Sequence, residues 1–125
     1  MSIFDQFGVS PIINAKGPAT RLSGGIMRPE VAQAMVEASQ HCVDMIELQA
    51  AASKAIAAAT GAEAGYVASG AAACLLLATA ACVTGLDPGA MARLPDTTGL
   101  KNEVVMARSQ RNFYDHAVCA AGVKI

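Results

Sequence analysis

The sequence predicts an α/β protein in which short apolar strands alternate with helices along a parallel or mixed sheet. Three observations support this fold class. Residues 65–68 are short and apolar, and the long run after them, residues 71–84, contains no charged side chain. Residues 103–107, Glu-Val-Val-Met-Ala, are predicted to form a second short strand, and residues 123–125 resemble the opening of a third strand. Because strands separated by helical segments are typical of β-α-β units, the expected order is β-α-β-α-β.

Two helices are expected before the first strand. Pro29 suits the first turn of a helix, and apolar side chains at helical spacing predict an amphipathic helix over residues 29–40. A second helix is predicted over residues 45–59, and Gly61 would end it in the usual carboxy-terminal position. Residues 12–25 begin like a strand and continue as a polar loop, which is either an exposed linker or a binding segment.

The uncharged residues 71–84 predict a helix that is apolar on every side and buried in a core. Gly85 would close this helix, and Pro88 would prevent its restart, so residues 86–102 are expected to form a loop. A further short helix is predicted over residues 117–121.

The composition is unusually apolar: 54% of the residues are hydrophobic and 15% are charged, against about 25% charged in an ordinary soluble domain. With 125 residues there is room for one domain at most. We therefore expect the apolar surface to be covered by a partner subunit, as in a homo-oligomer, or by further parts of a larger protein. Because the sequence stops at the opening of a strand, we expect an amino-terminal portion of such a protein.

Charge and cysteine content argue against several classes of protein. The net charge is −1 and there is no basic run, which argues against nucleic-acid binding. The four cysteines are widely spaced in apolar surroundings, which favours buried free thiols over disulfides or a zinc site, and no metal is expected. The amino terminus lacks the features of a signal peptide, so a cytoplasmic location is expected. The uncharged run is long enough for a membrane span, but its small residues and the acidic flanks Glu63 and Asp87 argue against one.

The junction at Ser69 and Gly70 is the candidate binding site. A strand that turns directly into a helix leaves unpaired backbone N–H groups at the positive end of the helix dipole, which suits an anion such as a phosphate. Ser69 adds a hydroxyl group, and Gly70 allows close approach to the backbone. A strand–helix junction without a ligand is the alternative interpretation. A dinucleotide site is less favoured, because the G-x-G-x-x-G motif is absent.

Four segments in combination resemble the selenocysteine synthase-like enzymes, which are related to L-seryl-tRNA(Sec) selenium transferase. These are pyridoxal-phosphate enzymes of the aspartate aminotransferase fold (fold type I). The segments are Ile13-Asn14-Ala15-x-Gly17, Leu22-x-Gly24, Thr60-Gly61-Ala62-Glu63-Ala64 and Ser69-Gly70-Ala71-Ala72-Ala73. The resemblance implies an amino-terminal arm and binding loop over residues 1–28. It also implies an incomplete cofactor-binding large domain of the fold-type I transferases over residues 29–125, with amino-terminal helices and the first β-α-β units of a mostly parallel sheet.

The resemblance assigns cofactor-binding roles to four residues. Ser69, Gly70 and Ala71 would hold the phosphate of pyridoxal 5'-phosphate, and His116 would stack on its pyridine ring. A histidine at a helix start, satisfied by Asp115, is the alternative interpretation of His116.

Weaker substrate-binding candidates follow from the same resemblance. A guanidinium group suits a carboxylate or a phosphate, although an exposed surface arginine is the alternative interpretation of Arg21. The candidates are Asn14, Thr20, Arg21 and Arg111.

The resemblance also implies the chemistry: imine formation with a small amino compound, followed by β-elimination or replacement, in a lyase or transferase. Such enzymes need a Schiff-base lysine. None of the four lysines of this sequence stands where the family places it, so we expect no catalytic residue in this chain and little cofactor binding by it. A transfer RNA substrate is not expected, because no basic patch is present. A non-catalytic α/β interaction module and an enzyme with a different phosphate-bearing cofactor are the alternatives.

Overall fold

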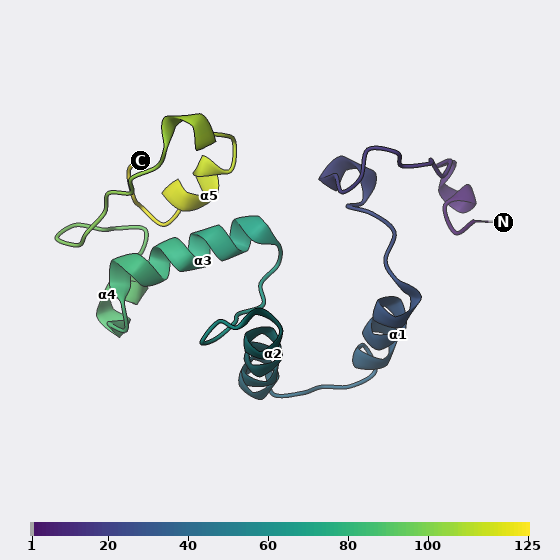
Figure 1. Cartoon of the computed structure of the whole chain (residues 1–125), viewed down its shortest axis with the longest axis horizontal. Helices are drawn as coiled ribbons and strands as arrows, with labels where there is room; N and C mark the ends of the chain where they lie inside the picture. Colours follow the sequence, from purple (N-terminus) through teal and green to yellow (C-terminus); the bar gives the residue numbers. More distant parts are fainter. Residues whose placement is uncertain (1) are drawn as a thin grey trace. The chain divides into compact units, whose positions relative to one another are not determined.

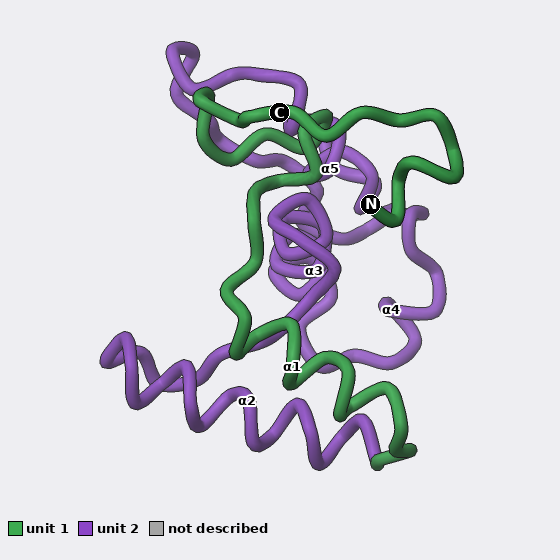
Figure 2. The backbone as a smooth tube through the Cα atoms, turned by 90° about the vertical axis from the view of Figure 1, so that its right-hand side faces the viewer, with its two compact units in different colours: residues 1–43 green, residues 44–125 purple. Residues whose placement is uncertain are grey.

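The computed structural model describes residues 2–125. The chain divides into two compact units, the first ending at Val43 and the second spanning Asp44–Ile125 (Figure 2). The first unit contains the 3-10 turns η1 (Asp5–Phe7) and η2 (Thr20–Leu22) and helix α1 (Pro29–Ala38). The second contains helices α2 (Met45–Thr60), α3 (Ala71–Thr84), α4 (Pro88–Arg93) and α5 (Asp115–Cys119), with the 3-10 turn η3 (Arg108–Gln110).

Both helices predicted ahead of residue 64 are present. Helix α1 starts at Pro29, as expected from the fixed φ of proline. Helix α2 begins after Asp44, whose Oδ1 accepts hydrogen bonds from the backbone N–H groups of Ile46 at 2.7 Å and Glu47 at 3.1 Å. It ends at Gly61, which adopts a left-handed conformation with φ of 75°.

The predicted strand at residues 65–68 is extended, but it does not pair with another strand. Three of its backbone groups, the N–H of Gly65 and the N–H and carbonyl of Val67, are bonded instead to side chains of helix α2, which precedes this segment in the sequence. This segment therefore differs from the prediction because a helix, rather than a neighbouring strand, supplies its hydrogen-bond partners.

The other two predicted strands reduce to a single bridge. Within residues 2–125 the structure has no strand, and Glu103 and Lys124 form an isolated parallel bridge. The N–H of Lys124 donates to the carbonyl of Asn102 at 2.9 Å, and the N–H of Val104 donates to the carbonyl of Lys124 at 2.8 Å. The chain is thus mostly helical. The parallel direction is the one the prediction called for, but a sheet needs more paired residues than these segments provide.

Helix α3 packs against α4 and α5 (Figure 1). The small core of this unit consists of Ala90, Val118, Ala121 and Val123. Of the α3 residues, Thr84 is buried, whereas Leu75 and Leu77 are 40% and 45% exposed.

The prediction that α3 is buried on all sides is therefore wrong for this chain, because the two helices that contact it are short and leave much of its surface uncovered. The four cysteines are also free but exposed, so the prediction that they are buried is wrong for this chain. No helix within residues 2–125 has both the length and the hydropathy that a membrane span requires.

Helix α4 was expected to be loop. Gly85 ends the preceding helix, as predicted. Pro88, which was expected to prevent a restart, instead occupies the first position of α4. The Asp87 carboxylate accepts hydrogen bonds from the N–H groups of Gly89 at 2.8 Å and Ala90 at 3.2 Å. Asp87 therefore caps a helix that starts at Pro88. An aspartate directly before a proline is the sequence signal that could have predicted this helix.

The cap at Asp44 gives the first testable prediction. Replacing Asp44 with alanine removes the acceptor for two N–H groups of α2 and should lower the free energy of unfolding by about 1 kcal/mol. Urea unfolding followed by circular dichroism measures the change. Asp44→Asn keeps an acceptor oxygen and should retain most of the stability. An equal loss in both variants would contradict the assigned hydrogen bonds.

Candidate functional site

The Ser69–Gly70 turn connects the extended segment to helix α3. Gly70 has φ of 93° and ψ of 171°, a conformation that favours glycine because it lacks a Cβ atom. Its N–H donates to the carbonyl of Ala68 at 2.7 Å, so this amide is used within the turn. No side chain caps the helix.

The first three N–H groups of α3 are unpaired. The N–H of Cys74 donates to the carbonyl of Gly70 at 3.2 Å and is the first amide of the helix with an acceptor. Within residues 2–125 the structure gives no acceptor for the N–H groups of Ala71, Ala72 and Ala73. These donors lie at the positive end of a 14-residue helix dipole. We call the backbone of residues 69–73 the anion turn.

The anion turn is open to solvent. Ser69, Gly70 and Ala71 are all exposed, and no heavy atom lies within 4 Å of the point where a Cβ on Gly70 would be. The Ser69 hydroxyl has no hydrogen-bond partner in the described part of the chain. An anion can therefore approach three N–H groups and one hydroxyl without displacing protein atoms.

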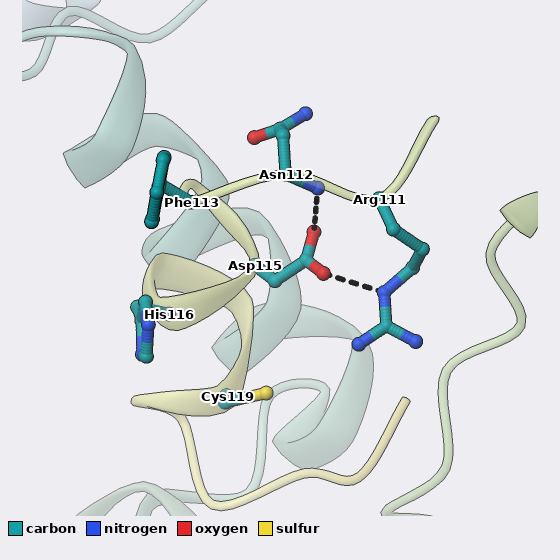
Figure 3. A pocket seen from close by; sticks show the side chains of 6 residues that line it. All are labelled: Arg111, Asn112, Phe113, Asp115, His116 and Cys119. Carbon is teal, nitrogen blue, oxygen red and sulfur yellow. Dashed lines mark hydrogen bonds and ion pairs between the residues drawn. The ribbon is translucent and has the colours of Figure 1, made fainter. Parts of the chain in front are cut away.

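A depression at helix α5 is lined in part by Arg111 and His116, whose side chains lie on opposite sides of the helix (Figure 3). It has a volume of about 670 Å³ and is lined by Arg111, Asn112, Phe113, Asp115, His116 and Cys119. The guanidinium Nε of Arg111 donates to the Asp115 carboxylate, which also accepts from the N–H of Asn112 at 3.3 Å. His116 is exposed on the other side of the helix from this pair (Figure 3).

This arrangement separates the two interpretations of His116. Asp115 was the partner expected if His116 had only a structural role. The Asp115 carboxylate is instead bonded to Arg111 and Asn112, and no hydrogen bond joins it to His116 among the described residues. The imidazole therefore stays available for a ligand. Its stacking on a cofactor ring remains a prediction.

The remaining candidates lie in the first unit. The Asn14 side chain is engaged in a local turn: its Nδ2 donates to the carbonyl of Gly17, and its Oδ1 accepts from the N–H of Lys16, both at 2.9 Å. Thr20 and Arg21 are exposed on a loop closed by two backbone hydrogen bonds between Ala19 and Gly24. The structure therefore presents Thr20 and Arg21 to solvent, whereas the Asn14 amide is occupied.

Two residues near the anion turn escaped the sequence analysis. Gln49 and Ser53 of α2 hydrogen-bond to the extended segment that leads into the turn. Their spacing of four residues places them on one face of a helix otherwise rich in alanine, and this pattern is the signal that could have identified them.

Comparison with known proteins identifies relatives of the chain. It is 36% identical over 120 residues to D-glucosaminate-6-phosphate ammonia lyase of Salmonella typhimurium (strain 14028s / SGSC 2262), and the alignment covers 96% of this chain and 32% of the enzyme. It is 37% identical over 117 residues to 5'-C-glycyluridine monooxygenase-decarboxylase of a Streptomyces species, covering 94% of this chain and 29% of that enzyme. No protein-family model matches the chain.

A solved structure of D-glucosaminate-6-phosphate ammonia-lyase has the same backbone arrangement. The TM-score is 0.94 at 34% sequence identity, covering 99% of this chain and 35% of that one. The chain is therefore homologous to the amino-terminal part of this lyase. It spans about a third of the length of the relatives that it matches.

The Arg111–Asp115 pair gives a prediction of pH dependence. The hydrogen bond from Arg111 holds the pKa of Asp115 below its ordinary value of 3.8, against the opposing effect of burial. Folding lowers the pKa of Asp115, so the ionised carboxylate stabilises the folded state at any pH above its ordinary pKa. This stabilisation is lost as the pH falls through the lowered pKa. Arg111→Gln should raise the pKa of Asp115 towards 3.8, as measured by carboxyl carbon NMR titration.

Arg108→Gln is the matched control, because Arg108 is also an exposed arginine but makes no ion pair with Asp115 in the described chain. It should leave the titration of Asp115 unchanged. A pKa of Asp115 that is the same in the wild type and in Arg111→Gln would contradict the assigned pair.

Proposed function

We propose that the anion turn binds the phosphate group of pyridoxal 5'-phosphate and that the chain belongs to a pyridoxal-phosphate-dependent lyase acting on an α-amino acid. The observation that supports this most strongly is the set of unpaired N–H groups at Ala71, Ala72 and Ala73, next to a glycine with positive φ. Backbone amides at a helix start are favourable donors for a phosphate. The homology to an ammonia lyase supports the enzyme class.

The residues of the anion turn fit the phosphate group. Ser69 offers a hydroxyl, Gly70 offers an unobstructed approach, and Ala71 begins the series of free amides. His116 presents an unpaired imidazole for the face of the pyridine ring. When bound, the cofactor supplies an electron sink for breaking bonds at the carbon that carries the substrate amine.

The names of the two relatives support an α-amino acid substrate. D-glucosaminate 6-phosphate and 5'-C-glycyluridine both carry an amine next to a carboxylate. Arg21 is the better candidate for that carboxylate, because its guanidinium is exposed and makes no ion pair within the described residues, whereas Arg111 is bonded to Asp115. Thr20, beside Arg21 on the same closed loop, would add a hydroxyl, whereas the Asn14 amide is already engaged.

The Schiff-base lysine is proposed to lie in the two thirds of the relatives that the chain does not match. Lys16, Lys54, Lys101 and Lys124 are the lysines present, and the resemblance assigns none of them to this role. We also propose that the exposed apolar side chains, such as Leu75 and Leu77, are covered in a homo-oligomer or by those further segments.

Residue-resolved NMR tests the phosphate site. The chain lacks the Schiff-base lysine, so binding is expected to be weak and the ligands are added up to concentrations that saturate weak binding. Inorganic phosphate and pyridoxal 5'-phosphate should then shift the amide signals of Ala71, Ala72 and Ala73 in the ¹⁵N-labelled chain, because these donors are free. Pyridoxal, which lacks the phosphate group but keeps the aldehyde that reacts with lysines, should leave them in place. Shifts confined to residues around the lysines, or equal shifts with pyridoxal, would contradict the proposal.

A glycine pair provides the matched variants. Gly70 and Gly99 both have positive φ, 93° and 79°, and both have open space at the Cβ position. Gly70→Ala strains the turn, and the phosphate affinity should fall roughly fivefold, as expected from the loss of about one hydrogen bond. Gly99→Ala also places a side chain at a positive φ, in a loop outside the anion turn, and should leave the affinity unchanged. Equal phosphate affinities in the two variants would contradict the role of Gly70.

A further inference from the structure

We propose that Gln49 and Ser53 of helix α2 are positioning residues for the anion turn. They hold the extended segment that leads into the turn and so fix where the N–H groups of α3 begin. This inference rests on the proposed function, since it concerns the same phosphate site, but it assigns roles to residues that do not touch the anion.

Gln49 pairs with the backbone of Val67 through both ends of its amide. Its Nε2 donates to the carbonyl of Val67 at 2.6 Å, and its Oε1 accepts from the N–H of Val67 at 3.2 Å. One side chain thus satisfies the donor and the acceptor that a neighbouring strand would otherwise satisfy. A two-point contact of this kind restricts rotation as well as distance, because a single hydrogen bond would leave the peptide free to pivot.

Ser53 makes the second contact one helical turn further along. Its Oγ accepts from the N–H of Gly65 at 3.0 Å. Four residues of a helix rise about 6.0 Å, and two residues of an extended chain advance about 6.6 Å. Gln49 and Ser53 therefore match the spacing of Val67 and Gly65, with the two segments running in opposite directions.

A third contact requires a glycine. A Cβ atom on Gly65 would overlap the side chain of Ile56, so the segment can lie this close to α2 only without a side chain at position 65. Ile56 and Ser53 are both partly buried at this contact. Three positions of α2, at 49, 53 and 56, thus contact residues 65–67.

The held segment ends directly at the anion turn. Val67 is followed by Ala68, whose carbonyl accepts the N–H of Gly70 at 2.7 Å. Two features therefore connect Gln49 to the first free amide of α3. They are the two hydrogen bonds between Gln49 and Val67, and the tight turn closed by Ala68 and Gly70. Without the Gln49 pair, the start of the turn loses its nearest hydrogen bonds to α2, and the Ser69 hydroxyl and the Gly70 backbone are held less firmly beside the first amides of α3.

Variants of α2 test this inference with phosphate as the probe. Gln49→Leu removes both hydrogen bonds while keeping a side chain that suits a helix. Affinity for inorganic phosphate, measured from the amide shifts of Ala71 to Ala73, should fall roughly fivefold. Hydrogen exchange of the Val67 amide should accelerate in the same variant, because its acceptor is gone.

Two substitutions of Ser53 remove and restore a single hydrogen bond, the one to the N–H of Gly65. Ser53→Ala should weaken phosphate binding, whereas Ser53→Thr keeps the hydroxyl and should restore it. Gln33→Leu is the matched control. Gln33 is also a glutamine on a helix, α1 of the first unit, and its side chain donates a hydrogen bond to Glu37 at 3.2 Å. This control should leave phosphate affinity and the Val67 exchange rate unchanged.

The outcomes separate the two proposals. If the wild-type amides of Ala71 to Ala73 do not respond to phosphate, the proposed function fails, and the positioning role fails with it. If the wild type responds and Gln49→Leu binds phosphate equally well while Val67 exchanges faster, the positioning role alone is wrong. Should Gln49→Leu fail to fold, the comparison of Ser53→Ala with Ser53→Thr decides, and equal affinities in that pair would overturn the inference.

Discussion

The first turn of an α-helix cannot satisfy its own N–H groups within the helix. The proposed phosphate site at the start of α3 depends on this constraint. Elsewhere in the second unit, the sequence provides a carboxylate at such a position: Asp44 caps α2 and Asp87 caps α4. Helix α3 has neither a cap nor an acidic residue in its first turn. Helix α3, which carries no charged side chain, thus begins with amides that have no protein acceptor among the described residues, and these are the amides to which the proposal assigns a phosphate.

The surroundings of α3 keep these amides available. The extended segment before it finds its hydrogen bonds in the side chains of α2, so it does not use the amides of α3. On the other flank, α5 packs against α3 and carries His116, while Asp115 is bonded to Arg111. No carboxylate within the described residues accepts a hydrogen bond from its N-terminal donors.

The sequence was sufficient to predict α1, α2 and α3, because their ends are set locally, whereas α4 lies in a segment that was expected to be a loop. Pro29 and Gly61 each determine a boundary through their own backbone preferences. The strands could not be predicted in the same way. Residues 65–68 are apolar enough for a strand, yet strand formation depends on a distant partner, and here the partner is Gln49 on a helix. Burial of α3 likewise depends on what lies against it rather than on its own composition.

For the site, the change of pattern at Ser69 and Gly70 predicts a turn into a helix, which the structure has, whereas anion binding there and the role that the resemblance gives His116 stay predictions. The sequence did not predict Gln49, because an isolated glutamine on a helix is usually a solvated side chain, and its contact with Val67 depends on the fold. Nor did it reveal that the Asn14 amide is engaged in its own turn.

A crystal structure of the protein grown with pyridoxal 5'-phosphate tests the central claim most directly. The account predicts a phosphate group within hydrogen-bond distance of the N–H groups of Ala71, Ala72 and Ala73 and of the Ser69 hydroxyl. A phosphate bound elsewhere on the protein, or a protein carbonyl or carboxylate occupying those amides, would contradict it.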